Sequence, residues 1–97
     1  MFRDYLSDFN YNLLKDTYNE EYLYSINKNT FLKNYHLLRS YNITCLEDII
    51  LNYLELFTYD SNILEERLKK LITSLGPNYN ELINNNLSLI NELIKET

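Results

Sequence analysis

The sequence predicts an all-α fold, a compact and irregular bundle of five to seven short helices. Apolar residues recur at spacings of three and four positions along the chain, which is the period of a helix with one buried face. The strict alternation of a half-buried strand is nearly absent. Helix-ending signals, among them the only glycine and the only proline at 76–77, recur at short intervals and exclude long helices. The chain has 97 residues, and we expect positions 1–97 to form a single helical domain.

The first segment predicts a helix with a largely aromatic core face. Five residues share that face at helical spacing: Phe2, Tyr5, Leu6, Phe9 and Leu13. Asp16 falls on the same face, where burial of its carboxylate would be unfavourable, so we expect this helix to end near Lys15. A short, tyrosine-rich second helix is expected at 20–26, followed by a loop at 27–29.

The third and fourth helices have recognisable start and stop signals. Thr30 is the predicted N-cap of the third helix, and Asn42 is the residue expected to end it in the left-handed conformation. Thr44 and Glu47 have the spacing of a capping box, which predicts the start of a fourth helix. The inward faces of the two helices are expected to carry Phe31, Leu32, Tyr35 and Leu38, and then Leu46, Ile49, Ile50, Tyr53, Leu54 and Phe57.

Three further helices are expected toward the C-terminus. Asp60 or Ser61 caps a fifth helix, which ends at the Gly-Pro pair. Its inward residues are Leu64, Leu68, Leu71 and Leu75. A second capping pattern at 78–81 precedes a short sixth helix, the asparagine run at 84–86 predicts a break, and Ser88 is the expected start of a seventh helix.

An internal repeat is visible in the second half of the chain. Residues 37–42 match residues 71–76, which lie 34 positions further on, and after a one-residue slip residues 48–57 match 81–90. Two unrelated leucine-rich amphipathic helices produce similar matches, so chance remains the alternative. Residues 38–94 resemble the helical repeats of the mitochondrial transcription termination factor family, in which two helices and a short third turn recur. That resemblance implies nucleic-acid binding, whereas this chain is acidic, spans about one and a half repeats, and has a leucine where the family tends to have proline.

Composition and charge favour a protein partner over a nucleic acid. The chain has no Ala, Val, Gln or Trp and many Asn and Tyr residues, a bias typical of an AT-rich genome. Its net charge is −5, with nine basic residues scattered among fourteen acidic ones. The densest basic group, at 67–70, follows Glu65 and Glu66 at the i,i+4 spacing of a solvated helix face. Direct nucleic-acid binding is therefore unfavourable, and a protein partner with a basic surface is expected.

The sequence indicates no secretion signal and no membrane span. Its start lacks a basic region followed by an apolar one, and no apolar run approaches the ~20 residues that a bilayer requires. The single cysteine cannot form an internal disulfide. We therefore expect a cytoplasmic, intracellular protein with no membrane partner.

No constellation of residues predicts catalysis. His36 and Cys45, the only histidine and cysteine, lie on different expected helices, and we interpret His36 as a solvated surface residue. Cys45 is either a partly buried filler or a thiol activated by a helix N-terminus. Acidic pairs such as Glu20 and Glu21 point to different helix faces. No metal site, no cofactor and no enzymatic activity are expected.

Tyrosine is the one residue type that suggests a binding surface. If the first helix continued past Asn19, Tyr11, Tyr18 and Tyr22 would form a stripe beside Lys15. Tyrosine is large, amphipathic and entropically inexpensive to immobilise, which suits it to interfaces. Ordinary core packing is the alternative interpretation. The candidate protein-binding surface comprises Tyr11, Tyr18, Tyr22, Tyr24, Asp4, Glu20 and Glu21.

Three functions follow from these observations. The first is a non-enzymatic protein-binding module, a small acidic inhibitor encoded by a mobile element, of the anti-CRISPR, anti-restriction or immunity type, that blocks a partner's surface. The alternative is a structural homo-oligomer, such as a homodimer, or a helical adaptor subunit. A nucleic-acid-binding helical repeat fragment is the third; clustering of Arg39, Arg67, Lys69 and Lys70 on one face would favour it.

Overall fold

Between Phe2 and Ile94, the range that the computed structural model describes, helices follow one another with no strand among them. The predicted all-α bundle is thus confirmed. The Cα radius of gyration of 13.2 Å is that of a compact chain of this length. The elements are η1 (Phe2–Tyr5), α1 (Asp8–Thr17), α2 (Glu20–Ser25), α3 (Lys28–Ser40), α4 (Leu46–Asn52), η2 (Leu54–Thr58), α5 (Ser61–Leu75), α6 (Tyr79–Asn85), η3 (Leu87–Ile90) and α7 (Asn91–Ile94), where η marks a 3₁₀ helix.

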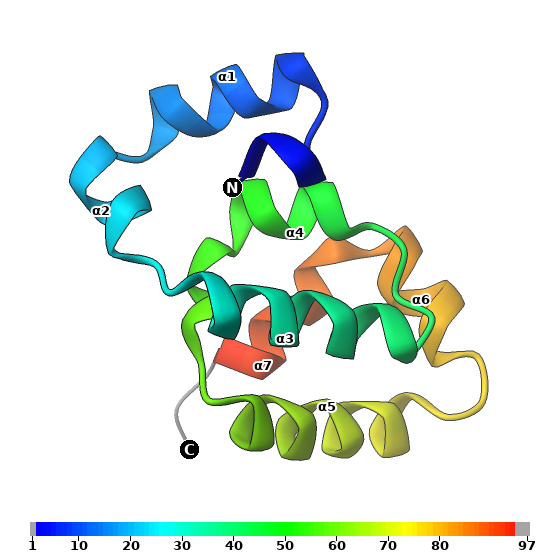
Figure 1. Ribbon diagram of the computed structural model, residues 1–97. Helices are drawn as coiled ribbons and strands as arrows, with labels where there is room; N and C mark the ends of the chain where they lie inside the picture. Colours follow the sequence, from blue (N-terminus) through cyan, green and yellow to red (C-terminus); the bar gives the residue numbers. More distant parts are fainter. Residues whose placement is uncertain (1, 95–97) are drawn as a thin grey trace.

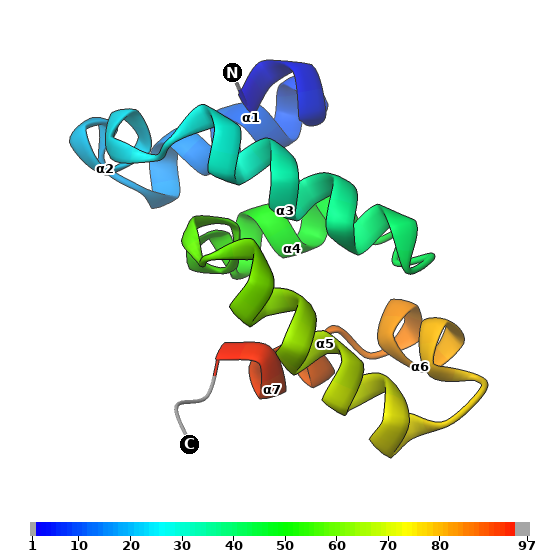
Figure 2. The ribbon, with the colours of Figure 1, turned by 60° about the horizontal axis from the view of Figure 1, so that its bottom comes forward.

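The helix α3 runs through the middle of the bundle (Figure 1). It packs against α4, η2 and α5, while α5 in turn contacts α6 and α7. The first elements, η1, α1 and α2, form a layer of their own at one end of the molecule, and we call them the N-terminal layer (Figures 1 and 2). Because α1 contacts α4 as well as η1, this layer rests on the rest of the bundle.

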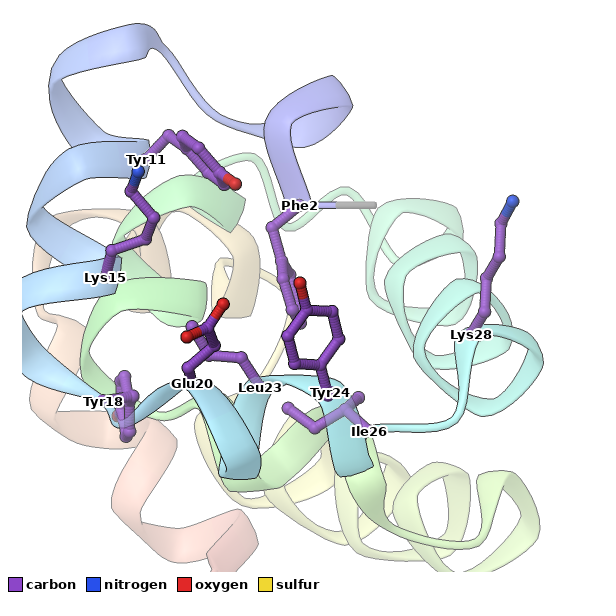
Figure 3. A pocket seen from close by; sticks show the side chains of 9 residues that line it. All are labelled: Phe2, Tyr11, Lys15, Tyr18, Glu20, Leu23, Tyr24, Ile26 and Lys28. Carbon is purple, nitrogen blue, oxygen red and sulfur yellow. The ribbon is translucent and has the colours of Figure 1, made fainter.

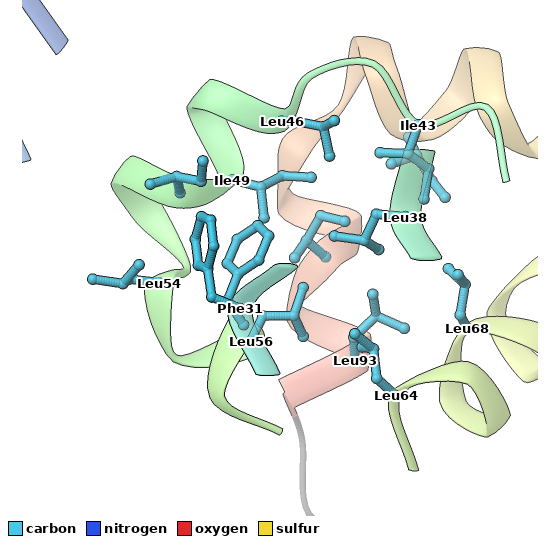
Figure 4. Packing of buried hydrophobic residues seen from close by; sticks show 14 of the residues in the cluster. Phe31, Leu38, Ile43, Leu46, Ile49, Leu54, Leu56, Leu64, Leu68 and Leu93 are labelled. Atoms are coloured by element: carbon cyan, nitrogen blue, oxygen red, sulfur yellow. The ribbon is translucent and has the colours of Figure 1, made fainter. Parts of the chain in front are cut away.

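The core is built from leucine, isoleucine and phenylalanine residues (Figure 4), most of them at positions that the periodicity selects; Ile43, Leu56 and Ile83 are buried without having been predicted. Phe31 lies at its aromatic centre, fully buried, with the rings of Phe2 and Phe57 at centroid distances of 5.1 and 5.0 Å. Such edge-to-face and tilted pairs add about 0.5–1.5 kcal/mol each beyond the area that they bury. Phe2 therefore fastens the start of the chain, and with it the N-terminal layer, to the centre of the bundle.

The predicted core face of the first segment is wrong for two of its five residues. Phe9 is 77% exposed and Leu13 is 43% exposed, whereas Leu14 is fully buried. The reason is a break at Ser7, whose hydroxyl caps α1 by accepting a hydrogen bond from the amide of Asn10 at 3.2 Å. The first segment is thus a 3₁₀ turn and a separate helix, so the helical periodicity does not continue from one to the other.

Two predicted caps are also replaced. Asn27, not Thr30, caps α3, because its Oδ1 accepts the amide of Thr30 at 3.0 Å. The capping box of Thr44 and Glu47 does not form. The Glu47 carboxylate instead accepts hydrogen bonds from the Ser7 amide and from the side chain of Asn10, and so ties α4 to the start of α1.

The start of α4 is capped from a distant helix. Asn84 of α6 accepts hydrogen bonds from the amides of Thr44 and Cys45 at 3.0 and 3.3 Å, and its own amide donates to the carbonyl of Asn42. The second predicted capping pattern, at 78–81, is also incomplete, because the side chain of the N-cap residue Asn78 makes no capping hydrogen bond. Glu47, which the sequence assigns to a local capping box, and Asn84, which lies in the run that predicts a break, thus both make long-range contacts.

The expected fourth helix is interrupted. Its helical run ends at Asn52, and after Tyr53 the chain continues as the 3₁₀ helix η2. Asn34 of α3, which is completely buried, donates to the carbonyls of Leu56, Phe57 and Tyr59 over distances of 3.4, 3.0 and 2.8 Å. Leu56 and Phe57 belong to η2 and Tyr59 directly follows it, so Asn34 binds the end of this 3₁₀ helix.

The order of elements in the second half of the chain repeats. A long helix, a short helix and a 3₁₀ turn occur as α3–α4–η2 and again as α5–α6–η3. Both long helices are followed by a residue of positive φ, Asn42 at 65° and Gly76 at 86°, as the stop signals predict. Asp60 caps the second long helix, also as expected. The faint sequence repeat therefore corresponds to a repeat of secondary structure.

We predict that Asn34→Ala lowers the free energy of unfolding by ~2–4 kcal/mol, because it leaves buried carbonyls without a donor. Urea denaturation followed by circular dichroism measures this. Asn29→Ala is the matched control, since Asn29 lies exposed in the same helix and its removal is expected to change stability little. Equal effects of the two substitutions would show that the buried amide does not hold the bundle together.

Candidate functional site

The N-terminal layer contains a groove of about 540 Å³ (Figure 3). Its walls come from η1, α1, α2 and the first residue of α3. The groove exists because α1 ends at Thr17 and α2 starts at Glu20, after its N-cap Asn19, whose Oδ1 accepts a hydrogen bond from the amide of Tyr22 at 2.9 Å. This cap turns the chain, so α1 and α2 diverge. We call this hollow the tyrosine groove; it is lined by Phe2, Tyr11, Lys15, Tyr18, Glu20, Leu23, Tyr24, Ile26 and Lys28.

The tyrosine groove has an apolar floor and a polar rim. Phe2 and Ile26 are buried and belong to the core, so the floor is held rigidly. Tyr24, by contrast, is 82% exposed and stands at the rim. The Glu20 carboxylate points into the space between the rings of Tyr11 and Tyr24 (Figure 3). Such a combination of apolar floor and few polar groups is typical of binding sites.

The groove carries more positive than negative charge, although the whole chain carries −5. Lys15 and Arg3 both stand over the ring of Tyr11, at 5.0 and 4.9 Å from its centroid. Lys28 lies at the opposite edge (Figure 3). Among residues 2–94 no ion pair within 4 Å engages these cations or Glu20. The charges of the groove are therefore available to an occupant.

The groove brings together four of the seven predicted surface residues: Tyr11, Tyr18, Tyr24 and Glu20. Tyr22 stacks on Tyr18 at 5.6 Å but lines a second, smaller hollow of about 320 Å³, where partial burial raises the pKa of its hydroxyl. Asp4 and Glu21 are exposed and line neither hollow. Because α1 and α2 are separate helices, Tyr11, Tyr18 and Tyr22 do not form the stripe expected of a continuous helix.

The sequence does not point to several of the groove residues. Phe2 belongs to the predicted core face, Leu23 and Ile26 lie in the expected second helix without an assigned role, and the turn at Asn19 places all three beside the groove. Exposure of Phe9 and Leu13 was missed as well. Ser7 is the residue that could have revealed this exposure. It is the N-cap of a new helix, so the buried face of the residues before it does not continue into α1.

The other chemically interesting residues do not converge. His36 is exposed, and its ring meets the ring of Tyr35 edge-on at 5.7 Å. Cys45 is half-buried, and this burial raises the pKa of its thiol above the ordinary value, although a hydrogen bond from its own backbone amide lowers it. No group of three potential metal ligands occurs between residues 2 and 94. Within the same range, no helix combines the length and apolarity needed to cross a bilayer.

The basic residues of α5 are largely engaged within the molecule. The Arg67 guanidinium donates to the carbonyl of Leu93 at 2.9 Å and lies over the ring of Tyr59. Lys70 pairs with Glu66 at 3.8 Å, as the i,i+4 spacing predicts. The companion pair with Glu65 does not form, because Glu65 accepts the hydroxyl of Tyr41. A hollow of about 620 Å³ beside Arg67 and Lys70 is also lined by Glu66 and Glu92, so it is not a uniformly basic surface.

We predict that Cys45 reacts with iodoacetamide more slowly than free cysteine at pH 7.5, because burial keeps its thiol protonated. Unfolding in urea should remove the difference. Mass spectrometry of the alkylated chain against time measures both rates. Faster reaction in the folded protein would instead indicate an activated thiolate.

Comparison with known proteins gives no relative: no family model, curated protein or solved structure matches the chain. The resemblance of residues 38–94 to mitochondrial transcription termination factors is therefore not accompanied by a family match. The order of helices recurs within this chain. The tyrosine groove and the surfaces around it are the features of the structure that bear on its function.

Proposed function

We propose that the protein is a non-enzymatic protein-binding module that seats a segment of its partner in the tyrosine groove. One observation carries the proposal: three of the predicted tyrosines line a single hollow with an apolar floor, together with two lysines that form no ion pair within residues 2–94. Tyrosine offers a large contact area at a low cost in rotamer entropy. A partner side chain that reaches the floor would be desolvated, as the central anchors of protein interfaces are.

The charge of the groove suggests what the bound segment carries. Lys15 and Lys28 stand at opposite sides, and Glu20 lies between them (Figure 3). A bound segment with an apolar anchor residue flanked by carboxylates could form ion pairs with both lysines. A hydrogen-bond donor on the same segment would face the Glu20 carboxylate. This arrangement is complementary in charge to a peptide segment, and complementarity of this kind favours specificity and fast encounter.

The biological role that fits such a module best is that of a small acidic inhibitor. With one partner segment held in the groove, the remainder of the bundle would stand over the partner's surface and exclude its other ligands. The net charge of −5 adds electrostatic competition where those ligands are anionic. A mobile element in an AT-rich genome is the expected source, and anti-CRISPR, anti-restriction and immunity proteins are the classes to which such a mechanism would belong.

We predict that Tyr24→Ser and Lys28→Ser each weaken partner binding by about tenfold, because each removes a rim contact worth about 1.4 kcal/mol. Both side chains are exposed, so the fold should be unchanged. The partner would be captured from cells that encode the chain, identified by mass spectrometry, purified and titrated calorimetrically. Leu82→Ser, at an exposed apolar position on α6, is the control expected to bind like the wild type.

Two results would contradict this function. One is capture of no protein by the wild-type chain. The other is equal affinity of the Tyr24, Lys28 and Leu82 variants for the captured partner, since the groove would then contribute nothing to binding.

A further inference from the structure

The hydrogen bonds that join the N-terminal layer to the rest of the bundle end on one atom. They come from the backbone amide of Ser7 and from the side-chain NH₂ group of Asn10, and both are accepted by Oε1 of Glu47. Between residues 2–26 and residues 28–94, no other hydrogen bond and no ion pair is made. The Glu47 carboxylate lies half-buried in the first turn of α4, and a charged acceptor of this kind binds more strongly than a neutral one. The polar attachment of the layer therefore depends on a single carboxylate.

The two repeat units, by contrast, are joined to each other at several independent points. Asn34 of α3 binds the first residue of α5, and Asn84 of α6 binds the backbone just before α4. The hydroxyl of Tyr79 donates to the carbonyl of Tyr41 at 2.8 Å, and the hydroxyl of Tyr41 donates to Glu65 at 3.0 Å. Loss of one of these contacts leaves the others in place. The layer depends on one carboxylate alone, so we expect it to open more readily than the units do.

Apolar contacts favour the closed position of the layer. Its buried apolar side chains are Phe2, Leu6, Leu14 and Ile26, while the rest of the buried core lies at position 31 and beyond. The rings of Phe2 and Tyr5 lie 5.1 and 5.6 Å from the ring of Phe31. Separation of the layer would expose these rings to water, which is unfavourable. The closed state is therefore the main one, and the directional bonds to Glu47 fix where the layer closes.

We propose that the N-terminal layer opens and closes on the bundle as one unit, and that the Glu47 carboxylate is the latch that holds it closed. The hinge is the junction of Ile26 and Asn27, where the chain passes from α2 to α3 (Figure 2). In the open state Phe2 leaves Phe31, and the start of α1 leaves Glu47.

Opening of the layer dismantles the tyrosine groove. Phe2 and Ile26 form the floor of the groove, and the core holds them only while the layer is closed. On the proposed function, on which this step rests, a partner segment in the groove binds the closed layer and stabilises it. Glu47 does not line the groove, so it is a positioning residue that sets how often the groove is complete.

Native-state hydrogen exchange of the ¹⁵N-labelled chain tests the opening. We expect the amides of α1 to exchange through an opening of lower free energy than the global unfolding that exposes the amides of α5. Asp60→Ala removes the cap of α5, a helix that stays intact in the open state. It should therefore speed exchange of the α5 amides about fivefold and leave that of the α1 amides unchanged.

Substitution of the latch should act on both sets of amides. The bonds of Glu47 are lost in the open state and in the unfolded state alike, so Glu47→Ala is expected to speed exchange in α1 and in α5 by about tenfold. Glu47→Gln keeps an acceptor oxygen without the charge and should recover part of this loss. Asp48→Asn is the matched control, because Asp48 lies exposed in the same turn of α4 and bonds nothing in the layer. It should change exchange of the α1 amides less than about twofold.

The partner captured by the wild-type chain tests the link to the groove. At about ten times its Kd it should slow exchange of the α1 amides about tenfold, because it binds the closed layer alone. Partner binding without slower exchange in α1 would contradict this link and leave the proposed function in place. Capture of no partner would contradict the proposed function, whereas the exchange measurements on the latch need only the pure chain.

Three results would overturn the latch. Equal acceleration of the α1 and α5 amides by Asp60→Ala would show that layer and bundle unfold as one unit. Unchanged exchange of the α1 amides in Glu47→Ala would show that the carboxylate does not hold the layer. Equal effects of the Glu47 and Asp48 substitutions on α1 would show a general effect of charge.

Discussion

The arrangement of the bundle depends on one buried amide. The side-chain NH₂ group of Asn34 in α3 donates hydrogen bonds to three carbonyls at the end of η2 and directly after it. The side-chain oxygen of Asn34 accepts a hydrogen bond from the hydroxyl of Ser61 at 2.9 Å. It thereby fixes both the end of η2 and the first residue of α5 against the central helix. The same contacts hold the backbone of Phe57 in place, so its ring meets Phe31, which also packs against Phe2, the anchor of the N-terminal layer. A polar group buried with its hydrogen bonds satisfied specifies one arrangement more strictly than apolar packing does.

The N-terminal layer is joined to this core by few but directional contacts. Phe2 enters the core, Leu14 is buried beneath α1, and the Glu47 carboxylate binds the amide of Ser7. Most of the remaining surface of the layer is exposed, including the rim of the tyrosine groove. The repeated α–α–3₁₀ units supply most of the core, and the layer adds Phe2, Leu14 and Ile26 to it while Tyr24 faces solvent.

Much of the fold could be predicted because periodicity and stop signals are local. The positive φ of Asn42 and Gly76, the cap at Asp60 and the inward leucines of α5 follow from neighbouring residues alone. The tyrosine groove was predicted only in part. Tyr11, Tyr18 and Tyr24 were chosen for their residue type, whereas their meeting in one hollow depends on the turn at Asn19. A break before the second helix was predicted, whereas the break at Ser7 is a short-range signal that the hydrophobic pattern concealed.

The sequence by itself therefore determined the helical class, the excess of acidic residues and the positions where long helices must stop, because each of these depends on residues close together in the chain. Only the tertiary structure decided how the polar side chains are used. Glu47 and Asn84 could cap locally, yet they bind backbone amides some forty residues away, and Asn34 could be solvated, yet it is buried. The physical reason is that a hydrogen-bonding group is bound by whichever partner packing brings within reach, and sequence spacing gives no measure of that distance.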